Sequence, residues 1–351
     1  MQGAPLGKQP TDLSEFKPAW WLRNCHLQTI LAKYLAPKRP LPLTAERFSL
    51  ADGDELMLNW TVAPSQIMAG QPIVMILHGL EGNFRSHYVR GLMHSLQQQG
   101  WAAVLMHFRG CHGETNKLAR AYHSGDTVDF HAVLTALQQR FPNQPFAAVG
   151  FSLGGNVLMK YCGEQAEHNP LRAAVAVSAP LMLAASAERI NQGFSRIYQR
   201  YLLGRLKRTI RQKIAQLPHF PQSISSHQLN RIRSIRQFDE MLTAPLHGFI
   251  NAEDYYRQAS AKPYLAAIRR PCLLIHAKDD PFLASNVIPT PAELSPWVRL
   301  LLSEQGGHVG FIGGGTPWQP HYWLDQVIPK FLTPYLTPDC ELTTVRSNVA
   351  C

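Results

Sequence analysis

The 351-residue sequence predicts an α/β fold with a doubly wound, mainly parallel sheet. Short apolar runs without polar alternation recur along the chain, as expected of strands that are buried on both faces. Helical stretches, including 88–99 and 127–140, separate several of these runs, and such alternation is typical of doubly wound sheets. The apolar runs are residues 72–77, 102–106, 146–149, 173–177, 272–275 and 298–302.

The order of the predicted elements divides the chain into a core and an insertion. Residues 47–60 hold an Asp-Gly turn between two extended runs, which predicts a strand pair before the parallel sheet. The strand rhythm stops between the sixth and seventh runs, where the chain is mostly helical. The predicted parts are an N-terminal extension packing on the core (1–43), the core (44–180 and 269–335), a helical cap insertion (181–268) and a C-terminal tail (336–351).

Composition excludes several classes of protein. The sequence contains no apolar run of about 18 residues, and its N-terminus lacks a signal pattern, so we expect a cytoplasmic protein rather than a membrane-spanning or secreted one. The six cysteines are scattered without a Cys-x-x-Cys pair, which predicts neither a disulfide framework nor a metal site. The net charge of +10 permits contact with anionic surfaces without requiring it.

The most informative motif follows the run at 146–149. Residues 150–155 read Gly-Phe-Ser-Leu-Gly-Gly, with a predicted helix over 156–161 after them. A strand, a serine flanked by small residues and a helix form the nucleophile turn of α/β-hydrolases. Gly150 and Gly154 permit close passage of strand and helix, and the helix N-terminus points its amides at the reaction centre. Ser152 is therefore the predicted nucleophile, and the predicted fold is an α/β-hydrolase fold.

A serine nucleophile needs a base and a group that orients the base. In this fold they follow the serine along the chain as an acid and then a histidine, each after a strand. The run at 272–275 leads to Asp279 and Asp280, and the run at 298–302 leads through a Gly-Gly turn to His308. We favour Asp280 over Asp279 because it lies three residues after Ala277 and directly before a proline.

A tetrahedral intermediate also needs two backbone donors for its oxyanion. One is predicted to be the Leu153 amide, directly after the nucleophile. The other is predicted to be the Leu80 amide, in the loop that follows the run at 72–77, where Gly79 permits close backbone approach. The glycines at 306–307 and 313–315 are predicted to be loop glycines near His308.

The predicted cap contains a strongly basic segment. Residues 189–236 hold eleven lysines and arginines and no acidic residue, and residues 194–203 could form an amphipathic helix. Two interpretations remain open: a solvated helical insertion, or a cap over the active site whose basic face meets anionic lipid or substrate. Both place the segment in a cap position, because it falls between the sixth and seventh strand-like runs. We expect at most weak peripheral contact with membranes. The segment lacks a nucleic-acid motif, so we predict no nucleic-acid partner.

Taken together, six motifs resemble the YheT-type α/β-hydrolases. They are Asn24–Thr29 (NCHLQT), His78–Gly82 (HGLEG), Met106–Cys111 (MHFRGC), Gly150–Gly155 (GFSLGG), His276–Phe282 (HAKDDPF) and Gly306–Phe311 (GGHVGF). The resemblance implies a serine carboxylesterase that acts on acyl esters without a cofactor. Eukaryotic proteins of similar pattern are membrane-anchored lipases or phospholipases, and this chain differs from them in lacking an apolar N-terminal segment.

The predicted function is hydrolysis of short- to medium-chain carboxylic esters, from small molecules or lipids, through an acyl-Ser152 intermediate, with no cofactor and no metal. A serine nucleophile argues against the dehalogenase and epoxide-hydrolase branches, which use an aspartate at that position. A lipase or phospholipase, a thioesterase and an acyltransferase with the same triad remain alternatives, as does a non-catalytic binding module on a hydrolase scaffold.

Overall fold

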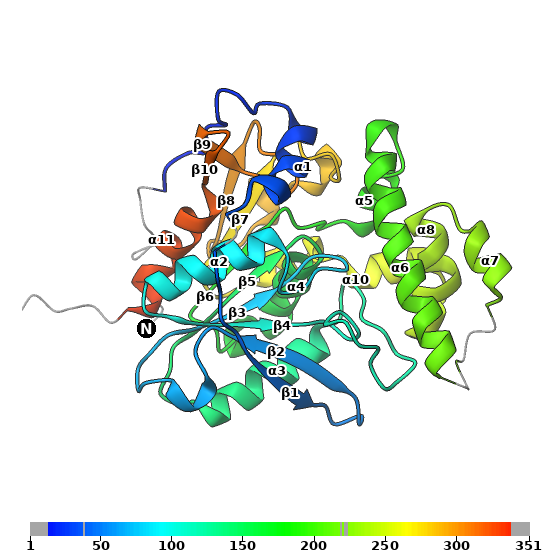
Figure 1. The fold of residues 1–351 in the computed structure, drawn as a ribbon, viewed down its shortest axis with the longest axis horizontal. Helices are drawn as coiled ribbons and strands as arrows, with labels where there is room; N and C mark the ends of the chain where they lie inside the picture. The colour runs from blue at the N-terminus through cyan, green and yellow to red at the C-terminus, as the bar shows by residue number, and fades with distance from the viewer. Residues whose placement is uncertain (1–12, 38, 218–219, 221–223, 338–351) are drawn as a thin grey trace, which may run out of the picture.

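An eight-stranded sheet forms the centre of the computed structural model, which describes residues 13–37, 39–217, 220 and 224–337 (Figure 1). The strands are β1 (Thr44–Ser49), β2 (Glu55–Trp60), β3 (Ile73–Leu77), β4 (Ala102–Met106), β5 (Phe146–Phe151), β6 (Ala173–Val177), β7 (Cys272–Ala277) and β8 (Val298–Ser303). Their order is β1-β2-β4-β3-β5-β6-β7-β8. The six neighbouring strands β4, β3, β5, β6, β7 and β8 are parallel to one another. Strands β1 and β2 form an antiparallel edge. The predicted mainly parallel sheet is therefore confirmed.

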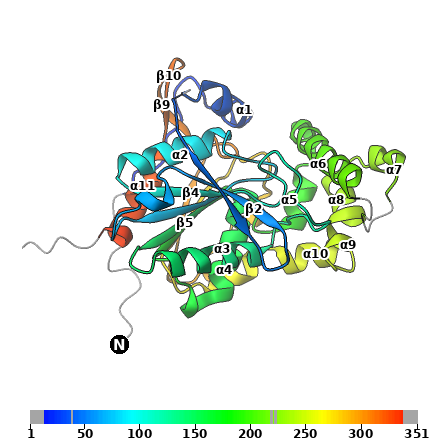
Figure 2. The same ribbon diagram turned by 60° about the horizontal axis from the view of Figure 1, so that its bottom comes forward.

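Helices cover both faces of this sheet (Figure 2). Helices α2 (His87–Gln98) and α11 (Leu324–Leu336) lie on one face, and α3 (Thr127–Arg140) and α4 (Leu153–Gln165) lie on the other. Alternate residues of β3 enter the two cores: Val74 packs in the layer of α2 and α11, whereas Met75 packs in the layer of α3 and α4. Both faces of the strand exclude water, and for this reason the sequence shows continuous apolar runs rather than alternation.

The segment between β6 and β7, residues 181–268, is helical, and we call it the cap. It contains α5 (Leu183–Arg189), α6 (Arg196–Gln216), α7 (Ser226–Arg231), α8 (Ile235–Phe238), a π-helical turn (Asp239–Thr243), α9 (Ala244–Leu246) and α10 (Ala252–Ala259). Both views place these helices at one end of the sheet. The cap has an apolar cluster of its own, formed by Leu203, Ile210, Leu229, Ile232, Phe238 and Leu242. The amphipathic helix expected over 194–203 is part of α6, which begins two residues later and is longer.

The N-terminal region packs against residues near the end of the core. Helix α1 (Cys25–Leu35) shares an apolar cluster with the hairpin of β9 (Ile312–Thr316) and β10 (Gln319–Tyr322). The prediction that 313–315 are loop glycines was wrong, because they lie in β9. A strand of glycines offers no side chains, so the usual β-strand signal is absent from the sequence. Residues 1–12 of the predicted extension and 338–351 of the predicted tail lie outside the described residues.

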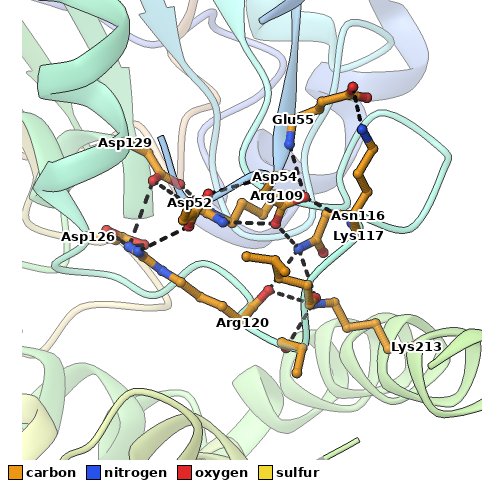
Figure 3. A network of polar contacts seen from close by, with 12 residues as sticks. Asp52, Asp54, Glu55, Arg109, Asn116, Lys117, Arg120, Asp126, Asp129 and Lys213 are labelled. Carbon is orange, nitrogen blue, oxygen red and sulfur yellow. Dashed lines mark hydrogen bonds and ion pairs between the residues drawn. The ribbon is translucent and has the colours of Figure 1, made fainter. Parts of the chain in front are cut away.

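A buried ionic network fixes the loop after β4 (Figure 3). The Arg109 guanidinium donates to both carboxylate oxygens of Asp129 on α3, at 2.7 Å each. It also contacts Asp52 and Asp54 of the β1–β2 turn, each at 2.8 Å. Arg109 is almost fully buried. Removing one partner from a buried ion pair leaves the other charge buried without a partner, which typically lowers stability by about 3–5 kcal/mol.

The same loop holds the cap. Lys213 of α6 is fully buried, and its ammonium donates to the backbone carbonyls of Leu118, Ala119 and Arg120 at 2.8, 2.9 and 2.6 Å (Figure 3). Burial lowers the pKa of Lys213 to about 8. The protonated ammonium has three N–H donors, and each meets one of these backbone carbonyls. This contact fastens one end of α6 to the core.

Replacing two helical glycines by alanine should change the stability of the protein in opposite directions. Alanine normally stabilises a helix over glycine by about 1 kcal/mol. At Gly204 of α6 an added Cβ meets nothing, so Gly204→Ala should raise stability by this amount. At Gly163 of α4 the Cβ would collide with the backbone carbonyl of Tyr264, so Gly163→Ala should lower stability by about 1–3 kcal/mol. Urea unfolding of both variants tests this, and equal stabilisation would contradict the packing of α4.

Candidate active site

Ser152 lies at a sharp turn between β5 and α4. Its backbone has φ 51° and ψ −119°, a conformation that costs a non-glycine residue of order 1–3 kcal/mol. The helix begins at Leu153, three residues earlier than predicted, so its first amides lie directly beside the serine. The flanking glycines have steric reasons: a Cβ at Gly150 would collide with the carbonyl of Gly154, and one at Gly154 would lie 2.5 Å from the carbonyl oxygen of Leu77.

Three residues from distant parts of the chain form a hydrogen-bonded line. The Ser152 Oγ lies 3.0 Å from His308 Nε2, and His308 Nδ1 lies 2.8 Å from Asp280 Oδ2. Asp280 follows β7 and His308 follows β8, so parallel strands bring both loops to the same edge of the sheet as the serine turn. With the Nδ1 proton donated to Asp280, Nε2 is free to accept the serine proton.

The two adjacent aspartates occupy different positions. Asp280 faces the imidazole, and its second oxygen accepts the Phe282 N–H at 2.8 Å. Asp279 instead accepts the N–H of Gly307 at 2.9 Å, in the turn before His308. Burial raises the pKa of Asp279 above its ordinary value, although the hydrogen bond from Gly307 partly opposes this effect. Asp279 therefore shapes the loop that carries the histidine, and the sequence motif had no signal for that role.

His308 is held by groups that the sequence did not reveal. Its backbone N–H donates to the Thr29 hydroxyl on α1 at 2.9 Å, and Thr29 donates to the Cys25 carbonyl at 2.8 Å. The Phe282 ring stacks on the imidazole, with ring centroids 3.9 Å apart and planes 8° from parallel. The next amide, that of Val309, donates to the Ser178 hydroxyl at 3.2 Å. Together these contacts restrict the imidazole to the orientation that meets both Ser152 and Asp280.

The loop after β3 lies beside the serine and presents a backbone donor. Gly79 N–H is taken by the Tyr88 hydroxyl, Glu81 N–H by Tyr122, and Gly82 N–H by the Gly79 carbonyl. Within the described part of the chain, the amides of Leu80 and Leu153 have no protein acceptor. Both residues line the same cavity as Ser152.

His78 fixes the start of this loop. Burial lowers its pKa to about 4, so the imidazole is neutral. A neutral ring has one donor and one acceptor. His78 Nδ1 donates to the Gly79 carbonyl at 2.7 Å, and Nε2 accepts the Phe108 N–H at 3.2 Å. Both nitrogens are satisfied, so His78 is a structural residue that links the loops after β3 and β4.

A cavity of about 930 Å³ opens onto Ser152 and His308. The cap supplies much of its wall, with apolar side chains from α5 and the residue that follows it, from α6 and from the π-helical turn. These residues include Leu183, Ile190, Tyr198, Leu202, Leu206 and Leu242. Binding pockets are commonly about 300–1,000 Å³ and mostly apolar, so this cavity is large enough for a chain of several methylenes.

Polar groups that could hold a metal do not gather at this site. In the described residues, no group of three His, Cys, Asp or Glu side chains has a metal-binding arrangement. The same part of the chain contains no helix with the length and apolar character that crossing a bilayer requires.

Comparisons with known proteins identify the family. Residues 72–314 match the family model described as "alpha/beta hydrolase fold". The chain is 47% identical to "Putative esterase YheT" of Escherichia coli, over 92% of this chain and 94% of that protein. It is 34% identical to "Monoacylglycerol lipase" of Saccharomyces cerevisiae, over 86% of this chain and 71% of that protein. The chain belongs to the alpha/beta hydrolase fold family, and the predicted resemblance to YheT-type proteins is confirmed.

Two further comparisons agree with this result. The chain is 29% identical to "Phospholipase ABHD3" of Mus musculus, over 96% of this chain and 82% of that protein. Among solved structures, the esterase Pf2001 of Pyrococcus furiosus superposes with a TM-score of 0.54 at 16% identity, covering 92% of this chain and 99% of that chain. At that identity the superposition establishes the fold alone, and it confirms the predicted fold class.

The different contacts of the two aspartates predict different effects of asparagine. Asp280→Asn should lower kcat by about 10⁴-fold, because asparagine favours the wrong imidazole tautomer, as in serine proteases. Asp279→Asn keeps an oxygen that accepts the Gly307 N–H, so it should retain most of the activity. Steady-state kinetics on a common ester decide between them. Reversed effects would assign the orienting role to Asp279.

Proposed function

We propose that the protein is a carboxylic ester hydrolase that works through an acyl-Ser152 intermediate. The observation that carries the proposal is the hydrogen-bonded line from Asp280 through His308 to Ser152, which opens onto a largely apolar cavity. Esterases and lipases among the relatives support it. A non-catalytic binding module would have no need of these hydrogen-bonded Ser, His and Asp side chains.

The proposed chemistry has two halves. His308 accepts the Ser152 proton as Oγ attacks the ester carbonyl, and the charge on the tetrahedral oxygen falls between the Leu80 and Leu153 amides. The imidazolium then protonates the alcohol, which leaves, and the acyl group stays on Oγ. A water that loses its proton to His308 then attacks the acyl carbonyl, and the imidazolium returns this proton to Ser152 Oγ as the C–Oγ bond breaks and the acid is released.

We infer that short- to medium-chain acyl esters are the preferred substrates and that the protein is cytoplasmic. The cap lines the cavity with apolar side chains, which suits an acyl chain. Four cysteines of the described residues, Cys25, Cys111, Cys162 and Cys272, are free thiols, as expected in a reducing compartment.

A second candidate is a lipase that takes long-chain lipid esters. Ile197 and Tyr201 of α6 line the cavity while more than half exposed, and the same helix is rich in arginine and lysine. Exposed apolar side chains beside basic ones suit contact with an anionic lipid surface. The relatives named as lipase and phospholipase agree with this candidate.

Replacing the nucleophile gives the first test of the proposal. A fluorophosphonate probe should label the wild type and leave Ser152→Ala unlabelled, and ester turnover should fall by about 10⁴-fold or more. Unfolding curves of the two proteins provide the control for folding. Labelling of Ser152→Ala at the wild-type rate would place the nucleophile elsewhere.

A series of substrates separates the two candidates. Soluble acyl esters of two to ten carbons should be hydrolysed faster than long-chain phospholipids in vesicles. Binding to anionic vesicles should be weak and lost as salt rises, because the screening length shortens to about 8 Å at physiological ionic strength. Turnover assays and vesicle sedimentation at low and high salt measure both. Salt-resistant binding together with faster phospholipid turnover would favour the lipase.

A further inference from the structure

We propose that Glu81 is a positioning residue through which the cap sets the geometry of the oxyanion site. The inference rests on the proposed function, because it concerns the Leu80 amide as an oxyanion donor. Glu81 is the next residue along the chain, so a displacement of Glu81 also displaces Leu80, whose N–H lies in the preceding peptide plane. Cap helix α6 binds Glu81 directly, and docking of the cap and formation of the oxyanion site are thereby one event.

Every polar group of Glu81 has a partner. Its backbone N–H donates to the Tyr122 hydroxyl at 2.9 Å, and that hydroxyl donates to Oε1 at 3.0 Å. Oε2 accepts from the Thr209 hydroxyl at 2.9 Å, and the backbone carbonyl accepts from the Arg205 guanidinium at 2.7 Å. The residue is buried, and its φ of 55° is unfavourable for a residue with a side chain. A strained conformation of this kind persists where its surroundings over-determine it.

The four bonds come from two different parts of the fold. Tyr122 belongs to the core loop that follows β4, and burial, Cys111 and Glu81 raise its pKa well above the ordinary value, so its hydroxyl remains a donor. Arg205 and Thr209 belong to α6, one helical turn apart on the same face. The cap therefore supplies half of the contacts that hold the loop, and it grips both the side chain and the backbone of Glu81.

Lys213 extends this contact along the helix. It lies one turn beyond Thr209 and donates to three carbonyls of the loop before Tyr122. Residues 205, 209 and 213 thus form a single stripe of α6 that faces the core, as expected for i, i+4 spacing. The cap cannot tilt at this helix without breaking contacts to Glu81.

This arrangement makes a specific kinetic claim. An oxyanion donor acts mainly in the transition state, and loss of one typically lowers kcat by about 10²–10³-fold. Displacing the Leu80 amide should therefore reduce kcat for every ester, including an acetate too small to contact the cap. A cap that only binds acyl chains would instead change KM, and only for long chains.

Two variants test the claim, each with a matched control. Thr209→Val removes the hydroxyl that α6 donates to Glu81 and should lower kcat about tenfold, and Glu81→Ala should lower it about 100-fold, consistent with partial or full displacement of one donor. Glu81→Gln keeps an oxygen for Tyr122 and gains an N–H for Thr209, so it should restore activity to within a few-fold. Thr127→Val removes an equivalent hydroxyl, which donates to Glu164 at 2.8 Å away from the site, and should have no effect.

Turnover of 4-nitrophenyl acetate and 4-nitrophenyl decanoate is measured together with the rate of fluorophosphonate labelling. The proposal expects the same fall in kcat on both esters, small changes in KM, and slower labelling by a similar factor. A rise in KM confined to the decanoate, or unchanged labelling in a folded Thr209→Val protein, would overturn it. If the wild type labels yet cleaves neither ester, the proposed function fails while the labelling rates still test Glu81. If the probe does not label the wild type, both the assignment of Ser152 as the nucleophile and this inference are overturned.

Discussion

The close approach of α4 to the ends of β3 and β5 is the constraint on which the rest of the site depends. Gly150 and Gly154 permit it, because a Cβ at either position would clash with neighbouring backbone atoms. This contact turns Ser152 out of the sheet and places the first amides of α4 beside the loop after β3. Any side chain there would separate strand from helix and move Ser152 away from His308. The motif is therefore a packing requirement as much as a chemical one.

The sequence was sufficient for the elements whose physics is local. Strands such as β3 appear as unbroken apolar runs, and Ser152, Asp280 and His308 follow strands in the chain order of this fold. Hydrogen bonds of 3.0 and 2.8 Å join these three side chains. The start of α4 was misjudged because glycines at 154 and 155 have low helix propensity, which tertiary packing overrides.

The parts that the sequence did not reveal depend on contacts between distant segments. Thr29 and Glu81 have ordinary side chains, and nothing in their neighbourhood along the chain indicates that one holds His308 and the other meets α6. The glycines at 313–315 have no side chains to mark a strand, and β9 exists because β10 pairs with it. Polar residues with long-range partners are thus harder to find from sequence than the nucleophile they serve.

The bond between Thr29 and His308 joins residues 279 positions apart in the chain. Closing a loop of that length loses more chain entropy than forming any contact within a single βα unit. Native contacts between residues far apart in the sequence also slow folding, since their favourable energy is gained only after most of the chain has lost its conformational entropy. His308 should consequently reach its final place late in folding. A chain that has formed its parallel sheet would still be inactive until α1 docks beside the histidine loop.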